Sequence, residues 1–388
     1  MQKILNICIP TYKRPATLLR CIDSIVRQIE SESLFDSVGI YVANDASPDD
    51  TAVLLRKYQS LNYFKAITRK QNFGMSQNIR HMLQEASEES SYQLIVTDDD
   101  YINLEVLNGL VRFLQKQEDS GSNVPAYWTP RYSYRESGEL FTIVCKSFNE
   151  DSLVNPTAFN TGRYMFNGFV LSGLIVRAEK IDYEFWETYK ENAFFPTLFF
   201  GDLIYRFGAG YLNKNIVHHT VLNECHWDRW GKNQVVIKFR LFADFANVYP
   251  IMVRRVGLLQ SRIAFYCASF PSIYGIVSRF LSSAELKFDR HIVREAINEL
   301  KVEGVLKFEW PLRSLMVIAY ILVSIVTVMN ILFYMCILIF IYSVSNVVSF
   351  LRLSSSTRVD LRKNYYKYRL YILLGLLRST PIALRVII

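Results

Sequence analysis

The sequence predicts an α/β protein in which a doubly wound, mainly parallel sheet precedes a helical C-terminal region with a membrane-associated hydrophobic segment. Short apolar runs alternate four times with segments of helical periodicity in about the first 100 residues, which is typical of such a sheet. Residues 315–350 then carry no charged side chain. We therefore expect an α/β domain at 1–240, a helical region at 241–311, and hydrophobic helices with a basic tail at 312–388.

The first strand and helix are the clearest elements. Ile4–Ile9 is a short apolar run that ends at Pro10, as expected of a buried strand. The next segment, 15–29, has apolar side chains at 18, 19, 22, 25, 26 and 29, which is helical spacing, and Pro15 suits the first turn of a helix.

The elements that follow repeat this alternation. Strands are expected at Val38–Ala43, Phe64–Thr68 and Leu94–Thr97, and helices at Thr51–Gln59 and Met75–Glu85. The rest of the domain, to residue 235, is expected to add short strands that form a second wall. Helices should then occupy 240–310, which places the domain boundary near 240.

Polar side chains follow the predicted strands. Ligands of open α/β sheets bind beyond the carboxyl ends of the strands, so these side chains should share one rim. They are Thr11, Asn44, Asp45, Asp98, Asp99 and Asp100.

Thr97-Asp98-Asp99-Asp100 ends a buried strand. Alternate side chains of an extended segment point the same way, so Asp98 and Asp100 are expected to face one ligand. Two adjacent carboxylates favour a cation, and Mg²⁺ or Mn²⁺ held by few carboxylates and phosphate oxygens meets that need. The alternatives are a solvated strand end or a helix cap.

Two further segments suit a nucleotide. Asp45 follows the second strand, where a carboxylate can hold a base or a ribose, whereas Asp49 or Asp50 suits a helix cap. In the segment 71–78, Gly74 before a helix lets the backbone approach a nucleotide, although an ordinary turn has the same pattern.

The order of four segments, CIPTYKRP, VANDASPDDT, KQNFGMSQNIR and LIVTDDD, resembles that of family 2 glycosyltransferases, whose fold is called GT-A. The resemblance is strong over 4–101 and extends to about residue 240. It implies inverting transfer of a sugar from a nucleotide-sugar to an acceptor hydroxyl.

The resemblance also implies roles for individual residues. Asp98 and Asp100 match the DxD metal motif for Mn²⁺ or Mg²⁺. Asn44 stands where the family often has Asp. The residues expected to bind the nucleotide-sugar are Pro10, Thr11, Tyr12, Arg14, Asp45, Asn72, Gly74, Asp98, Asp99 and Arg229.

Later segments are similar to the acceptor side of the family. The segment from Asn167-Gly168 to Arg177 looks like its glycine-bearing part. Phe200-Gly201-Asp202-Leu203 looks like the part that carries the catalytic base, with Gly in place of the usual Glu. The resemblance thus assigns the base to Asp202, since inverting transfer needs a carboxylate to accept the proton of the attacking hydroxyl. The alternative for Asp202 is a helix cap.

Three of the five histidines, His218, His219 and His226, fall within nine residues. We expect His218 and His219 to complete the metal site, with a structural role as the alternative. His226-x-x-Arg229-Trp230 is similar to the QxxRW of processive family members, with His in place of Gln. Arg229 would then neutralise pyrophosphate charge. The change to His, together with a single long apolar run, argues against a polysaccharide synthase.

The net charge of the chain is +8, and residues 351–388 alone carry +7. Basic residues flank the uncharged run at 315–350 on both sides, which favours a membrane hairpin with both ends in the cytoplasm. The alternatives are a tilted or interfacial helix and an apolar helical pair buried in a dimer. The segment 254–279 has interleaved basic and apolar positions, which suit either an amphipathic segment on the membrane or a packed helix.

Other features set limits on the function. The six cysteines form no CxxC pair, which argues against a disulfide framework and a cysteine zinc site and favours a reducing compartment. Residues 1–3 lead straight into the first predicted strand, so we expect no signal peptide. Several aromatic side chains could stack on sugars or belong to the core; they are Tyr127, Trp128, Tyr132, Tyr134, Phe159, Tyr164, Phe166 and Phe169.

The sequence therefore predicts a metal-dependent glycosyltransferase at the inner (cytoplasmic) membrane, with its active site facing the cytoplasm. Its partners would be a nucleotide-sugar donor, a lipid-linked or oligosaccharide acceptor in O-antigen or capsule assembly, and the membrane, but no nucleic acid. The alternatives are a polyprenyl-phosphate sugar transferase, an inactive membrane-anchored nucleotide-binding scaffold, and a protein whose tail binds nucleic acid.

Overall fold

The computed structural model describes residues 2–135, 137–221 and 234–257 and, between 261 and 269, three pairs of residues. The chain divides into two compact units, Met1–Ile273 and Tyr274–Ile388, and all described residues lie in the first. The predictions for the hydrophobic run, the basic tail, His226 and Arg229 fall outside the described residues.

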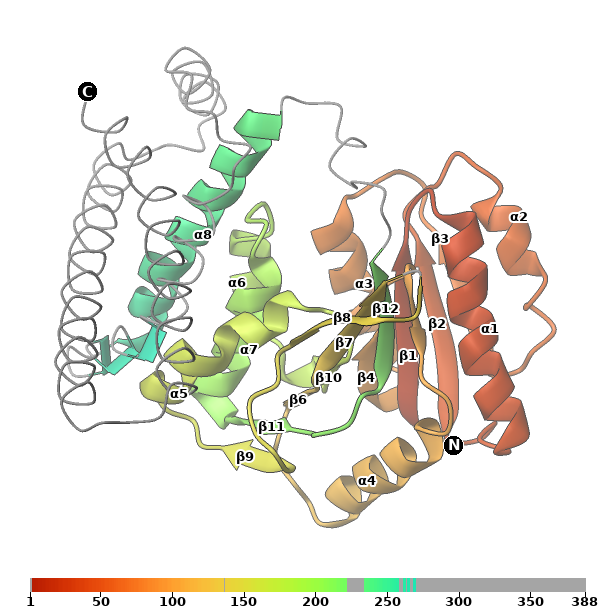
Figure 1. Cartoon of the computed structure of the whole chain (residues 1–388), viewed down its shortest axis with the longest axis horizontal. Helices are drawn as coiled ribbons and strands as arrows, with labels where there is room; N and C mark the ends of the chain where they lie inside the picture. Colours follow the sequence, from red (N-terminus) through yellow and green to blue (C-terminus); the bar gives the residue numbers. More distant parts are fainter. Residues whose placement is uncertain are drawn as a thin grey trace, which may run out of the picture. The chain divides into compact units, whose positions relative to one another are not determined.

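The main sheet has eight strands in the order β3-β2-β1-β4-β10-β6-β11-β9 (Figure 1). Its parallel half is built from the first four strands, as the alternating pattern predicts. These strands are β1 (Lys3–Thr11), β2 (Val38–Asn44), β3 (Phe64–Thr68) and β4 (Ser90–Ile95). The other half mixes parallel and antiparallel pairs. Its strands are β10 (Leu174–Val176), β6 (Ala126–Trp128), β11 (Ala209–Tyr211) and β9 (Ser152–Val154).

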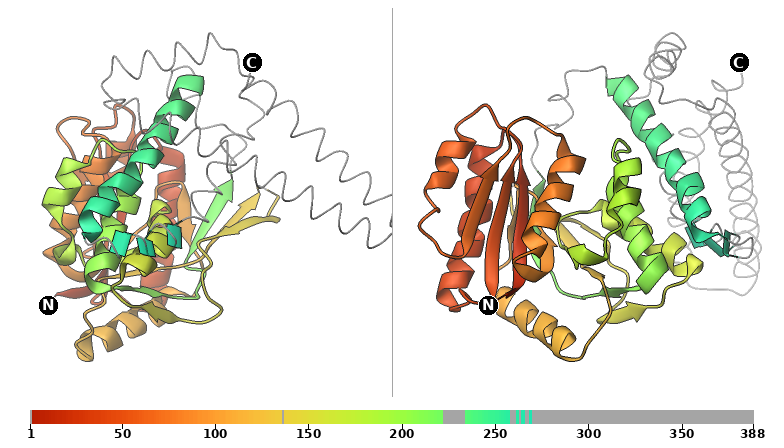
Figure 2. Two further views of the ribbon diagram at one scale, coloured as in Figure 1. Left: turned by 90° about the vertical axis from the view of Figure 1, so that its left-hand side faces the viewer. Right: turned by 180° about the vertical axis from the view of Figure 1, so that it is seen from behind.

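Helices cover both faces of the sheet (Figures 1 and 2). One face packs against α1 (Pro15–Ser31), α2 (Thr51–Arg56) and α4 (Leu107–Asp119). The other packs against α3 (Met75–Ser87), α6 (Tyr183–Thr188) and α7 (Phe195–Phe207). Alternation along β1 produces the two layers, since Ile7 and Ile9 belong to the first core and Cys8 to the second. The remaining helices are α5 (Ala158–Tyr164), η1 (Met165–Phe169), η2 (Ala178–Lys180) and α8 (Gln234–Val256).

A second sheet of four strands has the order β5-β12-β7-β8. It comprises β5 (Asp100–Ile102), β12 (Val217–Val221), β7 (Arg131–Arg135) and β8 (Leu140–Val144). Its strand β5 begins within the aspartate segment and pairs antiparallel with β12, which places His219 opposite Asp100. Of the short strands described up to residue 221, β6, β9, β10 and β11 extend the main sheet, and β7, β8 and β12 join β5 in the second sheet.

One local prediction is wrong, and the difference changes the site. The aspartates were expected to continue an extended strand to Thr97, but β4 ends at Ile95 and the chain turns. The amide of Asp100 donates to the carbonyl oxygen of Thr97 at 3.0 Å, which closes the turn around Asp98 and Asp99. The alternation that would place Asp98 and Asp100 on one side is therefore absent.

Of the region expected to be helical from residue 240, the described residues up to Val256 lie in α8. The predicted domain boundary near residue 240 falls inside α8, which continues to Val256. Within the described part of the chain, no helix is both long and apolar enough to span a membrane.

Candidate active site

The predicted polar rim is formed at the carboxyl ends of the parallel strands. The amide of Asp45 donates to the carbonyl oxygen of Thr11 at 3.0 Å, which joins the ends of β1 and β2. The Thr11 hydroxyl donates to Asp98 Oδ2 at 2.7 Å, which ties β1 to the turn after β4. Topology alone therefore brings together side chains that are far apart in the sequence.

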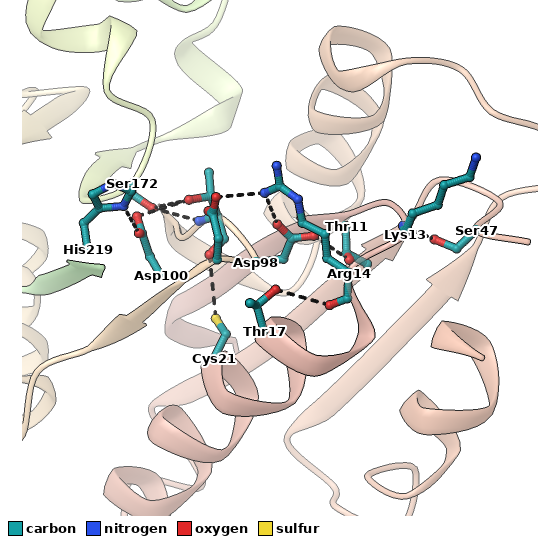
Figure 3. A network of polar contacts seen from close by, with 12 residues as sticks. Thr11, Lys13, Arg14, Thr17, Cys21, Ser47, Asp98, Asp100, Ser172 and His219 are labelled. Atoms are coloured by element: carbon teal, nitrogen blue, oxygen red, sulfur yellow. Dashed lines mark hydrogen bonds and ion pairs between the residues drawn. The ribbon is translucent and has the colours of Figure 1, made fainter. Parts of the chain in front are cut away.

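The turn at residues 97–100 is the aspartate turn. Two of its carboxylates contact one guanidinium group, that of Arg14. Arg14 Nη1 donates to Asp98 Oδ1 at 2.9 Å and to Asp99 Oδ2 at 2.8 Å. Figure 3 shows Asp98 between Thr11 and Arg14, with Asp100 turned toward His219. Asp98 and Asp99 thus share the Arg14 guanidinium, because the turn replaces the extended strand. The expectation that Asp98 and Asp100 hold a metal ion stays a prediction.

The charge of Asp98 is only partly balanced. Burial raises the pKa of Asp98 to about 6, against the opposing effects of the Arg14 charge and the Thr11 hydroxyl. Burial also acts on Asp99, but the Arg14 charge and hydrogen bonds outweigh it and lower the pKa of that carboxyl. A further positive charge near Asp98 would therefore be favourable.

Asp100 belongs to a different group of contacts. Its side chain is fully buried, and Asp100 Oδ1 lies 2.5 Å from His219 Nδ1. The other oxygen, Oδ2, accepts from the Thr97 hydroxyl at 3.1 Å and lies 3.9 Å from Arg131 Nη1. The structure therefore brings Asp100 and His219 into direct contact, away from the Asp98 carboxylate. Their role as metal ligands stays a prediction.

His218 points elsewhere. Its ring stacks between Tyr101 at 4.3 Å and Tyr134 at 4.1 Å. Neighbouring residues of a strand face opposite sides, so His218 cannot join His219 at Asp100. Burial, and next the charge of Arg20, lower the pKa of His218, which keeps this ring neutral at pH 7. The four predicted metal ligands therefore do not share one point in this arrangement.

The carboxylates of the rim can be compared with what a divalent cation needs. Among the described residues no group of three or more His, Cys, Asp or Glu side chains could hold a metal ion. However, Mg²⁺ in nucleotide sites is held by one or two carboxylates together with phosphate oxygens. Asp98 and Asp99 each present one oxygen to a single positive nitrogen, Arg14 Nη1. The carboxylates of Asp98 and Asp99 therefore fit the ligands that Mg²⁺ or Mn²⁺ needs in addition to phosphate oxygens.

Asp45 shapes the loop between β3 and α3. Its two oxygens accept the amides of Phe73 and Gly74, each at 2.9 Å, and the side chain is 3% exposed. Asn72 Oδ1 also accepts the Gly74 amide, at 3.0 Å. Gly74 has φ of 82°, a conformation that favours glycine. The structure thus gives Asp45 and Asn72 a loop-anchoring role, and their contact with a nucleotide stays a prediction.

The remaining predicted nucleotide residues lie at the same rim. Pro10 is in β1, and Tyr12 follows the strand with 39% of its surface exposed. The ammonium of Lys13 lies 5.0 Å from the centroid of the Tyr12 ring. Phe73, at the tip of the Asp45 loop, is 40% exposed. Two aromatic side chains are therefore open to solvent in segments next to the rim.

Ser172 is a polar residue of this site that the sequence patterns identified only as part of a segment. Its hydroxyl accepts the Thr97 amide at 2.8 Å and lies 2.9 Å from the Thr97 hydroxyl. The next residue, Gly173, has φ of 93° and donates its amide to Ile95 at 3.0 Å. The segment predicted to be acceptor-side thus directly supports the aspartate turn.

Asp202 lies in a different environment from the rim. It sits in the middle of α7, not at a helix cap, and is 1% exposed. Asp202 Oδ2 accepts from Arg206 Nε at 2.8 Å, and Oδ1 accepts from Arg255 Nε at 2.6 Å. Arg255 also pairs with Asp182 at 2.6 Å. In this arrangement Asp202 joins α7 to α8, and both of its oxygens are in ion pairs. Its role as the base stays a prediction.

The aromatic side chains divide between core and surface. Tyr127 and Trp128 are buried in the two cores, whereas Phe159 and Phe169 are nearly half exposed. Most of the buried aromatic side chains pack in the core. The sequence pattern alone could not separate them from aromatic side chains that are free to contact a sugar.

Residues 6–167 match the sequence model of the family described as Glycosyl transferase family 2. The resemblance to family 2 glycosyltransferases is confirmed over this segment. It includes β1, α1, β2, the Asp45 loop and the aspartate turn. No curated protein matches the chain.

Comparison with solved structures finds similar chains. The structure of S. aureus TarS 1-349 in complex with UDP-GlcNAc is 15% identical, with a TM-score of 0.54 and coverage of 76% of this chain and 80% of that one. Another structure of S. aureus TarS 1-349 is 17% identical, with a TM-score of 0.49 and coverage of 73% of this chain and 76% of that one. A mannosyltransferase from Pyrobaculum calidifontis, in complex with GDP-Man and Mn²⁺, is 12% identical, with a TM-score of 0.44 and coverage of 82% and 84%. At 15% identity the first of these shows a shared GT-A-like fold alone.

Proposed function

We propose that the rim around the aspartate turn binds the diphosphate of a nucleotide-sugar and transfers the sugar to an acceptor hydroxyl with inversion. The observation that carries this proposal is that the carboxylates of Asp98 and Asp99 both contact the Arg14 guanidinium at the carboxyl ends of the parallel strands. The family match over residues 6–167 supports it, and so does the UDP-GlcNAc bound to the TarS structure of similar fold.

The chain's own residues have separate tasks in this proposal. Thr11 holds the Asp98 carboxylate in place, and Arg14 balances the two aspartates. Asp98 and Asp99 would hold Mn²⁺ or Mg²⁺, and that ion would stabilise the charge on the departing diphosphate. The loop anchored by Asp45 would form the side of the nucleotide pocket. The resemblance assigns the catalytic base to Asp202.

We further propose that the acceptor is a lipid-linked oligosaccharide in O-antigen or capsule assembly at the cytoplasmic face of the inner membrane. Two sequence features support this acceptor. They are the uncharged run at 315–350 and the net charge of +7 in residues 351–388.

The proposal is tested with a panel of donors on the full chain in detergent. UDP-, GDP-, TDP- and CDP-sugars are added with Mn²⁺, and the midpoint of thermal unfolding is recorded. A ligand of the folded state raises that midpoint, so one nucleotide class should stabilise the protein. The shift should be lost with EDTA and in Asp99→Asn, but kept in Asp36→Asn, an exposed aspartate away from the rim. A folded protein that responds to no donor would refute the proposal.

A further inference from the structure

A groove of about 720 Å³ opens between α1 and β5, next to the aspartate turn. The proposed donor site does not use it. Arg20 connects the two, because its guanidinium donates to the carbonyl oxygen of Asp99 at 3.1 Å and also lines the groove. A ligand in the groove would therefore lie beside the turn that we assign to the donor diphosphate.

The groove carries positive charge. Arg20 and Arg27 both line it and are both exposed. They are seven residues apart on α1, which separates them by about 10 Å along the helix axis. No carboxylate among the described residues pairs with Arg27, and Arg20 contacts a carbonyl oxygen and the Tyr101 ring instead of a carboxylate.

Asp23 is the one acidic side chain among the lining residues, and its charge is engaged elsewhere. Asp23 Oδ1 accepts from the Tyr58 hydroxyl at 2.7 Å and lies 3.9 Å from the Lys57 ammonium, both of which belong to the α2 side of α1. With two guanidinium groups against this one carboxylate, the lining has a net positive charge, which favours an anion.

The floor of the groove is held in place by hydrogen bonds. Ser24 Oγ accepts the Ile102 amide at 3.1 Å, and Gln28 Nε2 donates to the Asn103 carbonyl oxygen at 2.7 Å. The wall is the stack of Arg20, Tyr101 and His218. These contacts order the floor and the Arg20 side of the groove before a ligand binds, whereas the exposed Arg27 side chain would be ordered by the ligand.

Apolar side chains complete the lining. Leu19 lines the groove from α1, and Leu104 lines it from the segment after β5 with 75% of its surface exposed. A leucine this exposed beside two guanidinium groups suits a ligand with an anionic end and an uncharged body.

We propose that this groove binds the phosphate-bearing part of the acceptor, with Arg20 and Arg27 on the phosphate oxygens and the uncharged body against Leu19 and Leu104. The chemistry is that of an organic phosphate or diphosphate ester. As an acceptor subsite it rests on the proposed transferase function, whereas as a phosphate site it stands on the groove alone.

The test is calorimetric titration of the full chain with glucose 1-phosphate and geranyl phosphate, and with glucose and geraniol as neutral counterparts. Both phosphates should bind, and Arg27→Ala should weaken the tighter one at least tenfold. Arg56→Ala is the matched control, since Arg56 is exposed on α2 outside the groove, and it should change nothing. Tighter binding of the geranyl ester assigns a lipid phosphate, and tighter binding of the glucose ester assigns a sugar phosphate; either supports the proposal.

Two results would overturn it. One is binding that is unchanged in Arg27→Ala or equal for the neutral compounds. The other is complete displacement of the probe by UDP, which would place the probe in the donor site. Failure of the proposed function is a separate outcome: if no donor binds while the probe still depends on Arg27, the groove remains a phosphate site and the transferase assignment fails.

Discussion

At the scale of the residue, the site depends on how the charges of the aspartate turn are balanced. One guanidinium nitrogen serves two carboxylates, and the pKa of Asp98 is still raised to about 6 by burial. The turn is therefore short of positive charge even with Arg14 in place. A cation that binds at the turn would be stabilised by this incompletely compensated negative charge.

Replacing Arg14 with Ala should increase the uncompensated negative charge of the turn, and both the stability and the response to Mn²⁺ should change. Without the guanidinium the paired carboxylates lose their counter-charge, and we expect a loss of about 2 kcal/mol in the free energy of unfolding. Mn²⁺ should then raise the midpoint of thermal unfolding more in Arg14→Ala than in the wild type, because it replaces the missing charge. Arg56→Ala serves as the control. An equal response to Mn²⁺ in all three proteins would contradict a cation site at Asp98 and Asp99.

Asp202 is a residue for which sequence and structure support different roles. A base mutated to Asn should lose turnover and keep its stability. A carboxylate that holds two arginines in a buried position should instead lose about 3 kcal/mol of stability when its charge is removed. We expect Asp202→Asn to lower the midpoint of thermal unfolding, because both oxygens are in ion pairs at 1% exposure. Full stability combined with lost activity would show that the ion pairs are dispensable and that the base assignment holds.

At the scale of the element, two loops define the rim, and each was predictable in part. Gly74 before a helix signalled the loop after β3, but the anchor that holds it, Asp45, is far away in the sequence. The aspartate turn was predicted as a continuation of the strand. An apolar run followed by polar residues occurs both where a strand continues and where it ends in a turn, so the sequence pattern does not distinguish the two. The contacts that settle the turn come from Ser172 and Arg14, which no local pattern contains.

The helix α3 is fastened to the strands by one charged pair. Arg69 donates to both oxygens of Glu85 at 2.7 and 2.9 Å, and the Tyr41 hydroxyl donates to Oε2 at 2.8 Å. Burial alone would raise the pKa of Glu85, but the hydrogen bonds from Arg69 and Tyr41 outweigh it and lower that pKa. The folded state therefore favours the ionised carboxylate. The stabilisation is fully present above the unfolded pKa and is lost as the pH falls through the folded pKa.

Glu85→Gln should accordingly destabilise the protein in a pH-dependent way. At pH 7 we expect a loss of about 1 kcal/mol, a modest value because the side chain is a third exposed. The difference from wild type should shrink as the pH falls below about 4, where the wild-type carboxylate is protonated in the unfolded chain and then in the folded one. Urea unfolding at several pH values measures this difference in the free energy of unfolding between Glu85→Gln and the wild type. A difference that stays constant with pH would show that the charge of Glu85 does not contribute.

At the scale of the whole molecule, the sequence predicted the α/β architecture because strand and helix periodicities alternate without interruption to residue 100. This alternation predicts a mainly parallel sheet with helices on both faces, but it does not predict the order of the strands. The second sheet was less predictable, since its strands are short and β5 pairs with β12 across more than 100 residues of sequence. Which side chain meets which, as with Asp100 and His219, is fixed only by that pairing.

The proposed membrane association belongs to this scale. The run at 315–350 and the basic tail predict that the full chain floats with vesicles that contain anionic lipid. Increasing salt should weaken the contribution of the tail more than that of the apolar run. Flotation assays at low and high salt, with neutral vesicles for comparison, measure both contributions. A folded chain that stays at the bottom of the gradient with either type of vesicle would contradict the proposed location.

The most direct test of the account is calorimetric titration of the full chain with the nucleoside diphosphate of the preferred donor, in the presence of Mn²⁺. The account predicts one binding site, with affinity at least about a hundredfold weaker in the double variant Asp98→Asn, Asp99→Asn, since both carboxylates that face the cation are neutralised; this corresponds to about 3 kcal/mol. Unchanged affinity in a folded double variant would contradict the central claim that the aspartate turn holds the donor diphosphate.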